Sequence, residues 1–185
     1  MKKERLEAFT DGVLAIVLTI LVLEIHLPAD NHSIDALLAI APEFLAYVFS
    51  FILIATMWVN HHYLFLQVTR INNRVIWTNI ILLFWSTILP ATTAWVGTDI
   101  HSQTAAIVYA INIVFYNIAF AFLRESVTKV NTIIKPKRQT ELWSFAINVL
   151  TLGVTFFWPP FVFIGLITNV LLWALPHLID HDPQV

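Results

Sequence analysis

The sequence predicts an all-α membrane protein with six transmembrane helices per chain. Of its 185 residues, 58% are hydrophobic and only 12% are charged, whereas a soluble domain carries about 25% charged residues. Long apolar segments recur along the chain, and the basic residues gather in alternate connections between them. This scarcity of charge argues against a disordered chain, a coiled coil and a domain that binds nucleic acid. The absence of cysteine excludes disulfides, thiolate metal ligands and a thiol nucleophile.

Six segments are apolar and long enough to be transmembrane helices, which need about 20 mostly apolar residues. They are residues 9–25, 44–59, 75–96, 105–123, 142–158 and 161–178. The segments are continuously apolar and lack the alternation of membrane β-barrel strands. Because they occupy most of residues 1–185, we expect a single transmembrane domain with no room for a soluble catalytic domain.

The first segment follows Lys2, Lys3 and Arg5, as the apolar part of a signal peptide would. However, Asp11 lies within the segment, and residues 25–28 (Ile-His-Leu-Pro) contain no small-x-small cleavage motif. We therefore expect a retained first helix.

The later segments have recognisable ends. Ser33 or Asp35 can cap the approach to the second segment. Residues 97–99 (Gly-Thr-Asp) close the third, and residues 158–160 (Trp-Pro-Pro) predict a tight turn before the sixth. The longest predicted connection is residues 124–141, which is polar and contains a proline.

The distribution of basic residues predicts the orientation. All ten lie before the first segment or in the second and fourth connections: Lys2, Lys3, Arg5, Arg70, Arg74, Arg124, Lys129, Lys135, Lys137 and Arg138. Basic residues concentrate on the cytoplasmic side of membrane proteins. We therefore expect a multi-pass protein of the cell (plasma) membrane with both termini cytoplasmic, a parity that six spans satisfy.

The acidic residues are distributed in the opposite sense. Five of the twelve fall on the predicted outer side: Glu24, Asp30, Asp35, Glu43 and Asp99. Ten basic and seven acidic side chains then give the cytoplasmic side a charge of +3, against −5 outside. Acids at an entrance raise the local cation concentration. The alternative is that the outer loops lack bases for topological reasons alone.

The first segment groups several residues on one helical face. On a wheel of about 100° per residue, Asp11 lies roughly 140° from Ile16, on the opposite side. The residues within about 60° of Ile16 are Arg5, Phe9, Gly12, Thr19, Ile20 and Leu23. In a symmetric oligomer, layers of such side chains can form a hydrophobic constriction. Packing against lipid or against the protein core explains the same pattern.

Two motifs resemble those of a known family. Residues 5–12, Arg-Leu-Glu-Ala-Phe-Thr-Asp-Gly, resemble the R-x-x-x-F-S-D signature that begins the first helix in the transmembrane protein 175 family. This family comprises the endolysosomal potassium channel and its shorter prokaryotic relatives. Residues 58–65, Trp-Val-Asn-His-His-Tyr-Leu-Phe, resemble the W-x-x-H-H-x-x-F pattern of the prokaryotic members. Thr10 replaces the usual serine and keeps the hydroxyl.

The resemblance implies a homotetrameric channel that conducts potassium, or monovalent cations with weak selectivity, passively along the first helix. Such channels lack the T-V-G-Y-G filter, which is absent here too. The pore layers would be Ile16, Thr19, Ile20 and Leu23. The signature residues Arg5, Phe9, Thr10 and Asp11 would brace the first helix against its neighbours, although Asp11, as an ionisable residue in a membrane helix, is also a candidate for ion contact.

The adjacent His61 and His62 raise the possibility of a metal enzyme. A metal site needs three or four convergent ligands, and the other five histidines are scattered along the chain. We therefore expect no enzyme, no catalytic residue, no resident metal and no cofactor. A polar network near the cytoplasmic end is the better interpretation; its candidate members are Asn60, His61, His62, Trp77, Asn79 and Asp11.

The main alternative function is a proton- or cation-coupled secondary transporter. Such a protein would carry ionisable pairs near the middle of the membrane and broken helices in its two halves. The middle of the predicted spans contains amides, among them Asn112, Asn148 and Asn169, but almost no charge. A membrane enzyme or a structural membrane factor is a further alternative, without a visible catalytic constellation.

Overall fold

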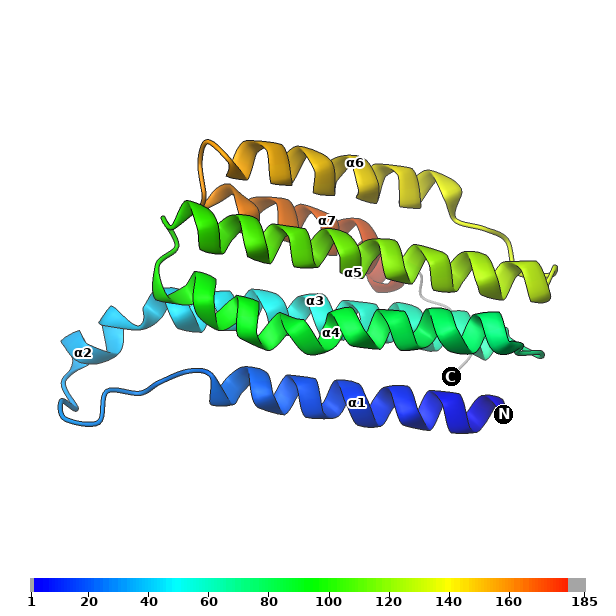
Figure 1. Ribbon diagram of the computed structural model, residues 1–185, viewed down its shortest axis with the longest axis horizontal. Helices are drawn as coiled ribbons and strands as arrows, with labels where there is room; N and C mark the ends of the chain where they lie inside the picture. Colours follow the sequence, from blue (N-terminus) through cyan, green and yellow to red (C-terminus); the bar gives the residue numbers. More distant parts are fainter. Residues whose placement is uncertain (1, 180–185) are drawn as a thin grey trace.

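The computed structural model describes residues 2–179, and in these the chain folds into helices joined by short connections. The helices are α1 (Lys3–Leu23), α2 (Ile34–Ala39), α3 (Ala41–Leu66), α4 (Asn73–Thr98), α5 (Gln103–Val130), α6 (Arg138–Thr155) and α7 (Phe161–Ile179). Figure 1 shows the six long helices side by side in one bundle, with the short α2 projecting from one end. The fold is all-helical across the described residues.

Each predicted span coincides largely with one long helix. By length and composition, α1, α3, α4 and α5 can cross a membrane. Helix α6 has 18 residues and begins with a polar turn from Arg138 to Glu141, which shortens its apolar part. In α7 the apolar stretch runs from Phe161 to Pro176.

The order of packing places α1 at an edge of the bundle. Helix α1 packs on α4 and α3, α4 packs on α5, and α5 packs on α6. Helix α7 contacts α6, α3 and α5. In Figure 1, α1 and α6 accordingly lie on opposite sides of the bundle.

The caps and the tight turn follow from local sequence. The side chains of Ser33, Asn72 and Ser102 accept hydrogen bonds from backbone N–H groups at the starts of α2, α4 and α5. Between α6 and α7, the N–H of Phe161 donates to the carbonyl oxygen of Trp158 at 3.1 Å. The turn predicted at residues 158–160 is therefore present.

The connection predicted over residues 124–141 is wrong in its bounds. Helix α5 continues to Val130 and α6 begins at Arg138, which leaves only residues 131–137 between them. The last two turns of α5 remain helical because their apolar side chains, including Val127, pack into the core. An ion pair between Lys129 and Glu125, one turn apart, supports the exposed side.

Asn131 joins two connections at the same end of the bundle. Its Oδ1 accepts hydrogen bonds from the backbone N–H groups of Thr69 and Arg70, both at 3.0 Å. Its Nδ2 donates to the carbonyl oxygen of Arg70, also at 3.0 Å. The α3–α4 and α5–α6 connections are therefore held together by one buried amide.

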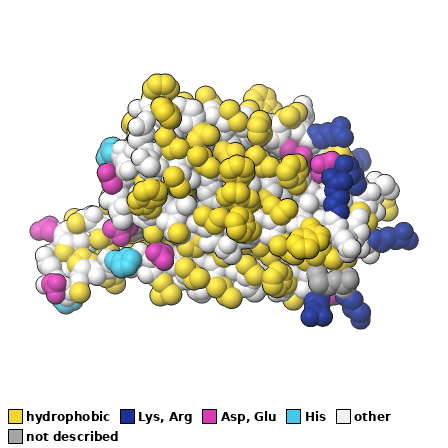
Figure 2. Space-filling model, in the orientation of Figure 1, with side chains coloured by type: hydrophobic (Ala, Val, Ile, Leu, Met, Phe, Trp, Pro, Cys, Tyr) yellow, Lys and Arg dark blue, Asp and Glu magenta, His cyan; other side chains and the backbone are white. Residues whose placement is uncertain are grey.

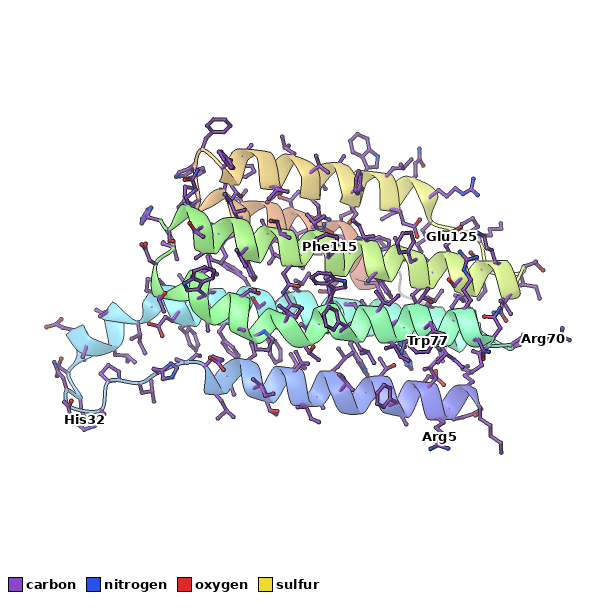
Figure 3. The ribbon with its side chains drawn as sticks, viewed as in Figure 1. Arg5, His32, Arg70, Trp77, Phe115 and Glu125 are labelled. Carbon is purple, nitrogen blue, oxygen red and sulfur yellow. The ribbon has the colours of Figure 1, made fainter. Side chains whose placement is uncertain are left out.

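The two ends of the bundle carry opposite charge. Figure 2 shows lysine and arginine gathered at one end and most visible acidic side chains at the other. We call these the basic end, with residues 2–5, 70–74 and 124–138, and the acidic end, with residues 24–43 and 99. Figure 3 labels Arg70 and Glu125 toward the basic end and His32 at the acidic end.

Close packing between α6 and α7 depends on one glycine. A Cβ atom added to Gly165 would lie 1.8 Å from Oγ1 of Thr151, far inside van der Waals contact. Elsewhere in the core, the hydroxyl of Ser50 lies 2.6 Å from that of Tyr109 and 2.8 Å from that of Thr93. These contacts join α3, α4 and α5 through buried polar groups.

Candidate functional site

Helix α1 has a buried face and an exposed face that are both mainly apolar. The buried residues recur every three or four positions and pack on α3 and α4: Leu6, Thr10, Leu14, Val17 and Leu21. The opposite face is exposed at Phe9 (53%), Ile16 (60%), Ile20 (40%) and Leu23 (74%). Arg5, Gly12 and Thr19 are exposed as well. The residues grouped by the helical wheel therefore share the surface of α1 that the chain itself leaves uncovered.

Thr19 adds a polar group to this exposed face. Its hydroxyl donates to the carbonyl oxygen of Ile16 at 2.8 Å. Because a hydroxyl oxygen keeps two lone pairs when it donates its proton, Oγ1 of Thr19 remains able to accept a hydrogen bond or contact a cation. If several copies met along this face, their side chains would form apolar layers and one ring of Thr19 hydroxyl oxygens.

Buried hydrogen bonds connect the covered face of α1 with α4 and α3. The Nδ2 of Asn79 on α4 donates to Oγ1 of Thr10 at 2.8 Å. The Oδ1 of the same amide lies 3.0 Å from Nε2 of His61 on α3, so the imidazole donates through that nitrogen. The His61 ring also stacks on Phe65, with centroids 4.2 Å apart. One amide thus couples three helices.

Asp11 forms a second link between α1 and α3. The indole Nε1 of Trp58 donates to Oδ1 of Asp11 at 2.8 Å. The Trp58 ring stacks on His62, with centroids 5.8 Å apart. Neighbouring residues on α1 therefore contact different helices: Thr10 contacts Asn79 on α4, and Asp11 contacts Trp58 on α3.

The structure separates the other candidate residues from these contacts. Trp77 is 64% exposed on α4 and takes no part in them (Figure 3). It lies two positions before Asn79, which turns it about 200° away around the helix. Asn60 instead donates to the carbonyl oxygens of Thr56 at 2.8 Å and Trp173 at 3.4 Å, and so reaches α7.

The structure places Arg5 and Phe9 on the exposed face of α1, and their bracing of this helix stays a prediction. Both side chains are exposed, and Figure 3 shows Arg5 on the side of α1 away from the other helices. The sequence analysis does not identify Trp58, the partner of Asp11, as a site residue. Its place at the start of the W-x-x-H-H motif is the feature that could have identified it.

Across residues 2–179, the titratable side chains form no metal centre. The described residues contain no group of three or more His, Cys, Asp and Glu side chains placed to hold a metal ion. His61 and His62 face different partners, an amide and an indole ring. The arrangement instead provides a helix, α1, that hydrogen bonds hold against its neighbours and that exposes an apolar face with one hydroxyl group.

Known proteins resemble this chain over most of its length. A potassium channel of Chryseobacterium sp. (strain P1-3) is 39% identical over 184 residues, covering 95% of this chain and 94% of that protein. A potassium channel of Streptomyces collinus is 37% identical over 140 residues, covering 72% and 68%. The endosomal/lysosomal proton channel TMEM175 of Danio rerio is 46% identical over 81 residues, covering 38% of this chain and 16% of that protein.

The structural and family comparisons agree with these relatives. The crystal structure of a lysosomal potassium-selective channel TMEM175 homolog from Chamaesiphon minutus matches with a TM-score of 0.67 and 32% identity. The match covers 91% of this chain and 96% of that one. The family described as "Endosomal/lysosomal potassium channel TMEM175" matches residues 5–90, which include both motifs and all of α1 except its first two residues. From the nearly full-length relative, the two motifs and the shared fold, we conclude that this chain belongs to the TMEM175 family.

Proposed function

We propose that the protein is a potassium channel in which four copies surround a pore lined by α1. One observation carries the proposal: α1 buries one face against its own chain and leaves Ile16, Thr19, Ile20 and Leu23 exposed on the other. A single helix cannot enclose a path for ions, so conduction along this face requires several copies. Relatives that match most of this chain are named potassium channels.

The exposed layers suit a hydrophobic constriction. Ile16 and Ile20 are one turn apart, about 6 Å along the axis, and Leu23 lies about 4.5 Å further on. Rings of such side chains gate by excluding water from a narrow pore. Thr19 places a hydroxyl oxygen between the apolar layers, where it can replace part of the hydration of a passing cation. Conduction would be passive and would require no cofactor.

The charge asymmetry supports an orientation with the basic end in the cytoplasm. Basic residues are retained on that side, which would place both termini there and make α6 and α7 membrane spans along with the other four long helices. The acidic end would face outward from the cell membrane. Its carboxylates would attract cations to the pore entrance.

A proton- or cation-coupled secondary transporter is the competing function. It requires paired ionisable groups near the middle of the membrane. Among the described residues, Asp11 is hydrogen-bonded to the indole of Trp58 and His61 to the amide of Asn79, so that neither is paired with an oppositely charged side chain. The ion pair of Arg124 with Glu141 lies at the basic end, beside the start of α6. These contacts favour a channel.

Ion flux into liposomes that contain the purified protein tests the proposal. We expect flux driven by membrane potential, larger for potassium than for sodium, and present without a pH gradient. Proton flux is measured in the same vesicles, because vertebrate relatives are named proton channels. Flux that appears only when a proton gradient drives it would identify a transporter instead.

The variant Ile16→Asn tests the assignment of the pore to α1. An amide at the constriction should wet it, raise conductance and reduce the preference for potassium over sodium severalfold. Ile164→Asn on α7 is the matched control, because Ile164 is also exposed (45%) but lies on a helix that does not contribute to the proposed pore. Equal effects of the two variants would show that α1 does not line the pore.

A further inference from the structure

Three buried polar atoms have no hydrogen-bond partner within the described part of the chain: Oη of Tyr116, Oγ1 of Thr155 and Nδ2 of Asn169. Tyr116 and Asn169 are 2% and 1% exposed and lie near the middles of α5 and α7. At that depth the surrounding hydrocarbon of a membrane offers no partner, and a polar group left without one is costly. These two groups therefore need a partner that the described residues do not supply.

A small cavity joins two of these three residues. It measures about 20 Å³ and lies between α3, α5 and α7, with Tyr116 and Asn169 both in its wall. One water molecule needs about 10–15 Å³ of such space and two to four polar partners. Thr56 of α3 also lines the cavity and carries a hydroxyl, which can both donate and accept a hydrogen bond. The cavity thus has the size and the polar wall that a single water molecule requires.

The Asn169 amide has one polar atom left over in either orientation. The hydroxyl of Ser144 on α6 donates to its Oδ1 at 3.1 Å, while its Nδ2 has no partner among the described residues. If the two amide atoms exchanged places, the nitrogen would donate to Ser144 and the oxygen would take the position without a partner. A water molecule bonds to the amide in both cases, because it can donate as well as accept.

Tyr109, two turns before Tyr116 on α5, shows a buried tyrosine whose hydroxyl is paired within the protein. The two side chains are 0% and 2% exposed. The hydroxyl of Tyr109 lies 2.6 Å from that of Ser50 on α3, and Tyr109 does not line the cavity. In the described structure, the hydroxyl of Tyr116 has no such partner, and the cavity lies beside its side chain. The same group on the same helix therefore has a protein partner at one position and a cavity at the other.

Water can reach the cavity from the basic end. Asn60 lines this cavity and also a larger one of about 460 Å³, whose wall includes part of the α5–α6 connection. None of the described residues that line the small cavity belongs to α1. The small cavity is therefore inside one chain and apart from the proposed pore, and an inference about it does not depend on the proposed function.

We infer that this cavity holds one ordered water molecule, which bridges α5 and α7. The hydroxyl of Tyr116 and the amide of Asn169 both bond to the water, and Ser144 extends the connection to α6. The water thus satisfies two buried polar groups at once and completes a polar link among three helices. Internal water molecules commonly have this role at buried groups that the protein leaves unsatisfied.

X-ray hydroxyl-radical labelling of the protein in lipid nanodiscs tests the inference. Radicals formed from a bound water molecule oxidise the side chains beside it, even where these are buried. We expect Tyr116 to be oxidised severalfold faster than Tyr109, with peptic digestion and tandem mass spectrometry assigning the modified ring. Since both rings are closed to bulk solvent, exposure alone predicts equal rates, and equal rates would overturn the inference.

The variant Asn169→Leu removes one partner of the water and fills part of the cavity. It should reduce the oxidation rate of Tyr116 severalfold, toward that of Tyr109. Asn79→Leu is the matched control, because Asn79 is also a buried amide that bonds to other helices but lies outside the cavity, and it should leave the rate unchanged. An equal change in both variants would show that the labelling reports the packing of the whole bundle and not a water bound at Asn169.

Thermal melting of Tyr116→Phe gives a second test, in which the two possibilities have opposite signs. With water bound, the substitution removes a hydrogen bond and should lower the melting temperature. In a dry cavity, it would remove an unpaired buried hydroxyl and raise the melting temperature. Tyr109→Phe loses the contact with Ser50 and should lower it in either case, which shows that the assay detects one lost hydrogen bond. A higher melting temperature for Tyr116→Phe would contradict a bound water.

Discussion

Helices α1 and α5 are equally apolar but are used differently. The most apolar 18-residue segments of the two helices have mean hydropathies of 2.1 and 2.0. Yet only 28% of the α1 segment is buried, against 50% of the α5 segment. Among the described residues, α5 packs on three helices, α4, α6 and α7, whereas α1 packs mainly on α4 and α3. Half of this segment of α5 is used to fold the chain, whereas most of the α1 segment is left for lipid or for other copies. Hydropathy alone does not distinguish these two uses.

The two sides of the bundle also differ in how polar groups connect helices. On α5, polar side chains that contact other helices are spread along the helix, from Tyr109 and Asn112 to Arg124. On α1, the side chains that bond to other helices in the described structure are Thr10 and Asp11, which lie in one turn. This contrast predicts that the region around α5 tolerates few substitutions, and that the attachment of α1 depends on a few contacts.

The largest effect is expected at the contact between α6 and α7. Gly165→Ala should reduce the free energy of unfolding by about 3 kcal/mol, at the upper end of the usual cost of overpacking, because the new methyl would overlap Thr151. Gly153→Ala and Gly12→Ala are controls, since a Cβ at either glycine has no neighbour within 4 Å. Thermal melting in detergent, followed by tryptophan fluorescence, measures all three; similar melting of the three variants would contradict the tight α6–α7 packing.

A smaller effect is expected for the buried support of α1. Asn79→Leu leaves the partners Thr10 and His61 without their shared amide and should cost about 2 kcal/mol. Asn117→Leu is the matched control, because the Asn117 amide donates to Ile113 of its own helix and joins no two helices. Unfolding in a graded detergent series gives the comparison, and a cost for Asn117→Leu that equals or exceeds that for Asn79→Leu would show that the link is dispensable.

The smallest effect is expected for the exposed link at Asp11. Asp11→Ala should cost about 1 kcal/mol of stability, and should lower the fraction of the proposed tetramer before it changes ion preference. Light scattering gives the assembly state and reversal potentials give the preference. Trp58→Phe removes the same hydrogen bond and should have the same effect. A fully assembled Asp11→Ala protein with altered selectivity would show that the carboxylate contacts ions.

The helices themselves were largely predictable from sequence because a membrane-spanning segment must be continuously apolar and about 20 residues long. The end of α5 was not, since residues 124–130 are polar enough to resemble a loop. Only the tertiary structure shows that Leu123, Arg124 and Val127 are buried there. The short helix α2 was also not predicted as an element, although its cap, Ser33, was.

The site was predictable in part, for a related reason. The wheel of the first segment identifies residues that share a face, but only packing decides which face is covered. The sequence places six candidate members of a polar network near one end, and in the structure His61 is hydrogen-bonded to Asn79. Two tryptophans, Trp58 and Trp77, precede these residues in α3 and α4. Trp58 reaches Asp11 and Trp77 does not, a distinction that depends on the rotation of α3 and α4 about their axes.

The position of the two hydrogen-bonded residues of α1 has a mechanical consequence. Thr10 and Asp11 hold α1 in its half nearer the basic end, beyond which only apolar side chains such as Leu14, Val17 and Leu21 pack it on its neighbours. Ile16 lies about 9 Å from Thr10 along the axis, and Leu23 about 20 Å. A tilt of α1 about the two hydrogen-bonded residues would displace Leu23 about twice as far as Ile16, so the width of a pore formed by several copies of α1 would change most near Leu23.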